Sequence, residues 1–146
     1  MNAAKPGRGS PVIPTFRYQD APAAIEWLCR MLGFEAHLIV SGEADGIVAH
    51  AQLTLGNGMI MLGSARYDDY HSDVRPAVGF EAPLTQAAYL VVSDVEAHYA
   101  RAKAARALIV MELAEQDYGG KLFACRDPEG QLWNIGSYDP WAGSGG

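Results

Sequence analysis

The strongest constraint on the fold is an internal repeat. A segment of β-branched and aromatic residues over positions 11–18 precedes Asp20, which is a helix start signal, and three strand-like segments follow that helix. The second half shows the same order of elements when it is laid on the first with a shift of 74 residues, which places Asp94 on Asp20. The sequence therefore predicts two tandem βαβββ modules, which is an α+β fold.

The first predicted helix begins after Asp20, because an Asp N-cap followed by Pro22 in the first turn favours helix initiation. Apolar residues then recur at helical spacing until Gly33, which favours a helix end. These residues are Ala24, Trp27, Leu28 and Met31. The second module matches with a helix over residues 95–105, but Arg106 stands where the first helix ends in glycine.

The remaining predicted elements are strands. In the first module they cover residues 34–40, 47–55 and 59–62, with a glycine-rich hairpin turn at 56–58. In the second module they cover residues 87–92, 108–111, 122–126 and 132–138. The strand over residues 47–55 alternates apolar with polar side chains, so its two faces differ. We expect Ala49, Ala51 and Leu53 to pack under the helix, and His50, Gln52 and Thr54 to point into a cavity.

Length and repeat together indicate one domain in this chain of 146 residues. We expect a mobile leader over 1–10, module one over 11–64, a linker over 65–85, module two over 86–141 and a flexible tail over 142–146. Each module should form a curled mixed sheet with one helix-covered face and one concave face. Two such sheets can surround a cavity, so we expect the function to lie there.

Charge and composition argue against several functions. The net charge of −6, with no run of basic residues, disfavours binding to nucleic acid or to an anionic membrane. Apolar runs are far shorter than the ~20 residues that a membrane helix needs. Cys29 and Cys125 make no disulfide framework, and the N-terminus has no apolar signal segment. We therefore expect a cytoplasmic protein without nucleic-acid or membrane partners.

Two segments carry a resemblance to a known family. Residues 15–20 (TFRYQD) precede the Ala-rich helix and Gly33, and residues 127–133 (DPEGQLW) lie near the end of the second module. Together with the duplication, they resemble the vicinal oxygen chelate (VOC) superfamily, which includes glyoxalase I, bleomycin-resistance proteins, fosfomycin-resistance enzymes and extradiol dioxygenases. The resemblance covers residues 11–141, and it is more specific for the fold than for the activity.

Metal-using members of that superfamily hold one divalent ion with His, Gln or Glu on the first and last strand of each module. The resemblance places these four positions at Ile13, Met61, Ala87 and Asn134. None is a usual ligand there, because divalent ions favour carboxylate or imidazole donors. We therefore expect no metal and no other cofactor. The alternative is an alignment shift of one residue, which brings Gln86 to the third position.

Arg17 is the first candidate for ligand binding. It shares a strand face with Ile13 and Thr15, and it matches an arginine that anchors an anion in the similar segment of glyoxalases. A buried guanidinium needs an anionic partner, which is either a ligand or an acidic side chain of this chain. His50 is the second candidate, either as a hydrogen-bond partner or as a proton acceptor, and a structural histidine is the alternative.

Aromatic and amide side chains complete the candidates. Tyr89 should face the cavity with a flat surface and a hydroxyl tip, and Tyr118 precedes two glycines that allow close approach of a ligand. By alternation Trp133 belongs to the core. The acidic residues within 68–73 match no metal-ligand spacing and are interpreted as solvated linker. The predicted ligand-binding set is Arg17, His50, Gln52, Tyr89, Tyr118 and Asn134.

Three hypotheses follow. The favoured one, which the likeness to bleomycin-resistance proteins implies, is a metal-free homodimer that binds a small organic molecule. The alternative is a metal-dependent lyase, thiol transferase or dioxygenase of the same superfamily, with His50 as a catalytic residue. The third is an interaction module whose cavity is filled by its own side chains, Met59, Met61 and Leu132.

Overall fold

The computed structural model describes residues 9–66, 74–77 and 79–143. The chain divides into two compact units, Met1–Val78 and Gly79–Gly146, and each is described here by itself. The boundary between them falls inside the predicted linker. The acidic residues within 68–73 lie outside the described residues, as do most of the predicted leader and tail.

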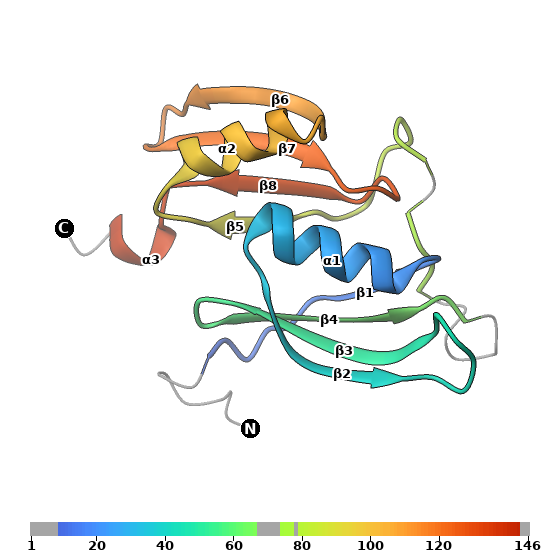
Figure 1. The fold of residues 1–146 in the computed structure, drawn as a ribbon. Coiled ribbons are helices and arrows are strands. Elements are labelled where there is room, and N and C mark those ends of the chain that lie inside the picture. Colours follow the sequence, from blue (N-terminus) through green and yellow to red (C-terminus); the bar gives the residue numbers. More distant parts are fainter. Residues whose placement is uncertain (1–8, 67–73, 78, 144–146) are drawn as a thin grey trace. The chain divides into compact units, whose positions relative to one another are not determined.

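The first unit is a four-stranded mixed sheet with one helix (Figure 1). Its elements are β1 (Thr15–Tyr18), α1 (Ala21–Leu32), β2 (Glu35–Ser41), β3 (Val48–Leu55) and β4 (Gly58–Ser64). The strand order is β1-β4-β3-β2, in which β1 runs parallel to β4 and the other neighbours are antiparallel. The predicted βαβββ order of this module is confirmed.

The second unit repeats this architecture (Figure 1). Its elements are β5 (Ala88–Val91), α2 (Val95–Ala104), β6 (Leu108–Glu115), β7 (Lys121–Arg126), β8 (Leu132–Gly136) and a short α3 (Pro140–Gly143). The order β5-β8-β7-β6 matches that of the first sheet, with β5 parallel to β8. The α+β fold with two curled mixed sheets is confirmed. The described helices include none that is both long and apolar enough to span a bilayer.

The repeat extends to hydrogen bonds. Asp20 accepts from the backbone N–H of Ala23 at 3.1 Å, and Asp94 accepts from that of Ala97 at 3.0 Å. Each carboxylate satisfies a backbone donor that the first helical turn leaves unpaired. The N-cap role predicted for both residues is therefore confirmed.

A second matched pair was not predicted from the sequence. Ser64 accepts from the backbone N–H of Val48 at 2.9 Å, and Ser137 accepts from that of Lys121 at 3.0 Å. Val48 and Lys121 are the first residues of β3 and β7. In each unit a serine thus fixes the start of the third strand: Ser64 is the last residue of β4, and Ser137 directly follows β8.

The burial of β3 confirms the predicted facing with one correction. Ala51 and Leu53 are 0% exposed, whereas His50 is half-buried on the opposite face. Ala49, which was predicted to pack under the helix, is also half-buried, and the buried residue at this end is Val48. The cause is a β-bulge in the β2–β3 pairing, which adds one residue and breaks strict alternation.

Strand β6 is longer than predicted. The apolar run ends at Met111, but pairing with β7 continues to Glu115, which lies opposite Lys121. Register shifts on both sides of Met111 disturb the alternation that the sequence pattern needs. The alternation of apolar and polar residues therefore did not reveal that β6 continues to Glu115.

Arg106 has a positive φ of 60°, the only such value among the described non-glycine residues. A side chain in this region costs about 1 kcal/mol, so we expect Arg106→Gly to raise the free energy of unfolding by up to ~1 kcal/mol. Urea denaturation measures this change. Ala105 is a suitable control because its φ is −86°, and Ala105→Gly should lower the stability instead. Equal effects of the two variants would contradict the interpretation.

Candidate functional site

The open face of the first sheet brings together the predicted residues of that unit. Arg17 on β1 lies opposite Gly63 on β4. Gln52 on β3 lies opposite Met61, which is also on β4. His50 is two residues from Gln52 and shares its face. The other face of these strands packs under α1 and is buried. Three of the six predicted ligand-binding residues therefore occupy one surface.

Gly63 gives the Arg17 side chain its place on this face. A Cβ atom added to Gly63 would lie 2.6 Å from Nη1 of Arg17, so the guanidinium lies directly across the glycine. Arg17 is half-buried, and the described residues supply it with no hydrogen bond and no ion pair. The sequence left two kinds of partner open for Arg17, a ligand and an acidic side chain. The described residues provide no acidic partner. The cation is available to a ligand.

His50 and Gln52 form a second polar group on this face. Nε2 of Gln52 lies 3.1 Å from Nε2 of His50. An amide nitrogen only donates, so the His50 Nε2 atom is the acceptor in this contact. The Nδ1 atom of the ring is the one left for a ligand. Its Nε2 lone pair is occupied, which disfavours proton abstraction by that atom.

The second unit carries a tyrosine cluster. The hydroxyl of Tyr89 donates to the carbonyl oxygen of Tyr138 at 2.7 Å, and the rings of Tyr118 and Tyr138 make an edge-on contact with centroids 5.0 Å apart. Burial raises the pKa of Tyr89, and Tyr118 adds to the rise. The Tyr89 hydroxyl is therefore protonated at neutral pH. The predicted residues Tyr89 and Tyr118 are connected through Tyr138.

Gly136 leaves room for the Tyr89 side chain, as Gly63 does for that of Arg17. A Cβ atom on Gly136 would lie 2.5 Å from the Tyr89 hydroxyl oxygen, so the side chain crosses the glycine. Both glycines precede the paired serines at the end of the fourth strand. This Gly-Ser repeat, at 63–64 and 136–137, was missed in the sequence analysis. The two dipeptides are 73 residues apart (136 − 63), one residue fewer than the shift of 74 that aligns Asp20 with Asp94, so that alignment does not place them on each other.

Asn134 lies on the open face of the second sheet. It pairs with Tyr89 on one side and with Ala124 on the other, and it is half-buried. Its neighbours Trp133 and Ile135 are 0% exposed on the opposite face. The prediction that Trp133 belongs to the core is confirmed, and Asn134 faces away from that core.

The donor set at the four positions that the resemblance assigns to metal ligands does not fit a divalent ion. Ile13 and Ala87 offer no donor atom, Met61 offers a thioether and Asn134 a neutral amide. Across the described part of the chain, no three or more His, Cys, Asp or Glu residues gather closely enough to hold a metal ion.

Neither cysteine has the properties of a nucleophile. Burial raises the pKa of Cys125 to about 12, and the charge of Asp127 contributes to the rise. Burial and the nearby Glu35 also raise the pKa of Cys29. Both thiols are protonated at neutral pH, and a thiol reacts only as its thiolate.

Comparisons with known proteins agree on the family. The sequence profile of the Glyoxalase/Bleomycin resistance protein/Dioxygenase superfamily matches residues 13–135. TioX from Micromonospora sp. ML1 is 30% identical, with a TM-score of 0.66 over 86% of this chain and 95% of TioX. An integron cassette protein of V. cholerae, VCH_CASS1, is 17% identical, with a TM-score of 0.61 over 88% of this chain and 95% of its own.

A mutant of glyoxalase I from Zea mays is 16% identical, with a TM-score of 0.62 over 85% of this chain and 43% of its own. At this identity the likeness shows the fold alone. A search among curated proteins found no match.

Proposed function

Because the chain belongs to the glyoxalase/bleomycin resistance protein/dioxygenase superfamily, we propose that it binds a small organic anion without a bound metal. The site is the open face of the first sheet, with Arg17, His50 and Gln52 as the polar contacts. In the second unit, Tyr89, Tyr118 and Asn134 are the residues proposed to contact a ligand. Binding rests on shape, aromatic surface and these few directed polar groups.

The observation that carries this proposal is that Arg17 has no hydrogen-bond or ion-pair partner among the described residues. A half-buried guanidinium loses part of its hydration, and an anionic ligand compensates this loss well. The described residues supply no anionic partner, while Gly63 leaves the guanidinium room on the surface of the sheet. His50 and Gln52 add polar groups on the same face of the sheet. These groups suit a carboxylate or a similar anion.

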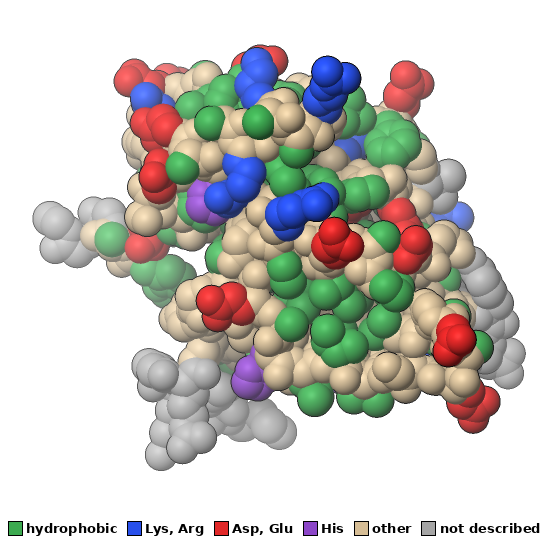
Figure 2. Space-filling model, viewed as in Figure 1, with side chains coloured by type: hydrophobic (Ala, Val, Ile, Leu, Met, Phe, Trp, Pro, Cys, Tyr) green, Lys and Arg blue, Asp and Glu red, His purple; other side chains and the backbone are tan. Residues whose placement is uncertain are grey.

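We also propose a homodimer in the cytoplasm. The edge strand β2 is exposed along its length and contains no Lys, Arg or Pro to protect the edge. Leu38, Ile39 and Val40 are between 43% and 47% exposed, and Figure 2 shows hydrophobic atoms at the surface of the first unit beside α1. Apolar surface of this kind is typical of an interface between copies.

A nucleic-acid partner is not proposed, because the charges are mixed in sign. Basic and acidic side chains are interspersed on the face shown in Figure 2. Lys121 pairs with Glu96 at 3.2 Å, and Lys103 pairs with Glu112 at 3.7 Å. A nucleic-acid surface instead needs a continuous basic patch.

Native mass spectrometry of the full chain, purified from its own host without added metal, tests the proposed function. We expect the mass of a dimer carrying an organic adduct and no metal in stoichiometric amount. Stoichiometric Ni, Zn, Mn or Fe, lost when His50 or Asn134 is substituted, would instead indicate a metal-dependent lyase, thiol transferase or dioxygenase. If there is no adduct and no small carboxylate or sulfonate raises the melting temperature, the proposal fails.

We expect Gly63→Ala to weaken binding of the retained anion by about 10- to 100-fold, because the added Cβ displaces Nη1 of Arg17 and one charge-assisted hydrogen bond is lost. Isothermal titration calorimetry measures the affinity. Arg17→Gln should give a similar loss. Gly58→Ala on the same strand is the matched control, since its Cβ would meet only Leu55 O at 3.3 Å. Wild-type affinity in both Gly63→Ala and Arg17→Gln would place the site elsewhere.

A further inference from the structure

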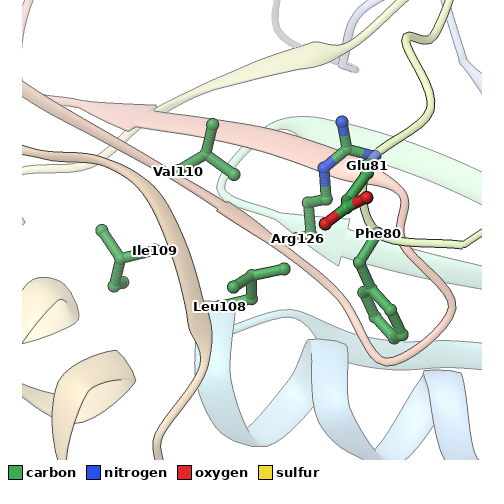
Figure 3. Close-up of a pocket in the computed structure, with 6 residues that line it drawn as sticks. All are labelled: Phe80, Glu81, Leu108, Ile109, Val110 and Arg126. Carbon is green, nitrogen blue, oxygen red and sulfur yellow. The ribbon is translucent and has the colours of Figure 1, made fainter.

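The second unit contains a groove that none of the predicted site residues lines. Its volume is about 620 Å³, within the range of small-molecule sites. Figure 3 shows the groove between the first residues of β6, the end of β7 and the segment that precedes β5. The residues that line it are Phe80, Glu81, Leu108, Ile109, Val110 and Arg126.

The walls of the groove are apolar and exposed. Phe80, Leu108 and Val110 are between 46% and 52% exposed, which is high for large hydrophobic side chains that lie together. Covering such surface releases water and stabilises a complex. The groove therefore favours a ligand with an apolar body.

Arg126 supplies a fixed positive charge at this groove. Its Nη1 donates to the carbonyl oxygen of Gly130 at 2.9 Å and its Nη2 to that of Ala82 at 3.1 Å. These bonds use two of its five N–H groups and hold the guanidinium in place. No carboxylate among the described residues forms an ion pair with Arg126. The remaining donors and the charge are available without a cost for ordering the side chain.

Glu81 limits the charge of the ligand. It lines the same groove but forms no ion pair with Arg126 among the described residues. Its carboxylate repels a second negative charge near the guanidinium. We propose that this groove binds a monovalent organic anion, whose apolar body contacts Phe80, Leu108 and Val110 and whose charged group meets Arg126. This site does not depend on the face that carries Arg17.

The test uses 2-naphthoate as the probe and neutral 2-naphthamide as its uncharged counterpart. In ¹H–¹⁵N NMR titrations of the full chain, we expect naphthoate to shift the amide signals of Leu108, Val110 and Arg126. Naphthamide should bind about tenfold more weakly, because it lacks the charge-assisted bond. Absence of naphthoate binding, or equal affinity of the two probes, would overturn the proposal. So would shifts confined to residues around His50 and Gln52.

Glu81→Gln provides a gain of affinity that a damaged fold would not produce. Removing its negative charge should tighten naphthoate binding about two- to fivefold and leave naphthamide binding unchanged. Glu115→Gln, at the far end of β6, removes the same charge away from the groove and should change neither. Val110→Asp should weaken naphthoate binding. If Glu81→Gln has no effect or acts equally on both probes, the charged group does not lie beside Arg126.

Discussion

Replacing Asp127 by alanine is expected to lower the free energy of unfolding by about 4 kcal/mol. Asp127 is 1% exposed, and its Oδ1 accepts from the backbone N–H groups of Glu129 and Gln131, both at 3.0 Å. Its Oδ2 accepts from Nε1 of the fully buried Trp133 at 3.1 Å. Alanine leaves these three donors without their acceptor, and each buried unpaired donor costs about 1–3 kcal/mol. Urea denaturation followed by tryptophan fluorescence measures the loss.

Asp127→Asn separates the contribution of the two backbone hydrogen bonds from that of the bond to Trp133. An asparagine Oδ1 can still accept the two backbone N–H groups, but its Nδ2 then faces the Trp133 N–H donor to donor. We expect a loss between those of wild type and Asp127→Ala. Asp139→Ala is the control, because Asp139 accepts one bond, from the backbone N–H of Trp141, near the exposed C-terminal end. If Asp127→Ala costs no more than Asp139→Ala, the buried network does not stabilise the fold.

The sequence predicted the fold because its signals are local and appear twice. The N-cap residues Asp20 and Asp94 act within one helical turn, and the alternation that buries Ala51 and Leu53 acts along one strand. Such signals need no knowledge of distant residues. They failed at Ala49 and beyond Met111, where bulges in the pairing with a neighbouring strand change the period.

The site was predicted less completely, because it depends on contacts between strands. The sequence predicted the strand face on which Arg17 and His50 lie, yet the contact of Gly63 with Arg17 follows from the β1–β4 register, which the sequence does not state. The groove of the second unit was missed for a similar reason. Arg126 is held there by two carbonyl oxygens, which no side-chain pattern in the sequence reveals.

Gly130→Ala is expected to lower the free energy of unfolding by about 3 kcal/mol. Gly130 has a φ of +97°, which a side chain rarely adopts, and an added Cβ would lie 1.8 Å from the carbonyl oxygen of Gly79. Because this obstacle is backbone, it cannot turn aside as a flexible side chain does. We expect the segment over residues 79–82 to leave the β7–β8 turn. Urea denaturation measures the stability, and hydrogen exchange measures the loosening of the segment.

Gly46→Ala distinguishes the two causes of this loss. Gly46 also has a positive φ, +77°, but nothing lies within 4 Å of its added Cβ, so the variant should lose only about 1 kcal/mol for the strained backbone. The excess loss in Gly130→Ala then reports the contact with Gly79. Release of the segment also withdraws the apolar contact of Phe80 from the groove and the Ala82 carbonyl oxygen from Arg126, and these losses outweigh the removal of the Glu81 charge. Gly130→Ala should therefore weaken naphthoate binding while Gly46→Ala does not, and equal behaviour of the two variants would show that Gly79 does not pack against the turn.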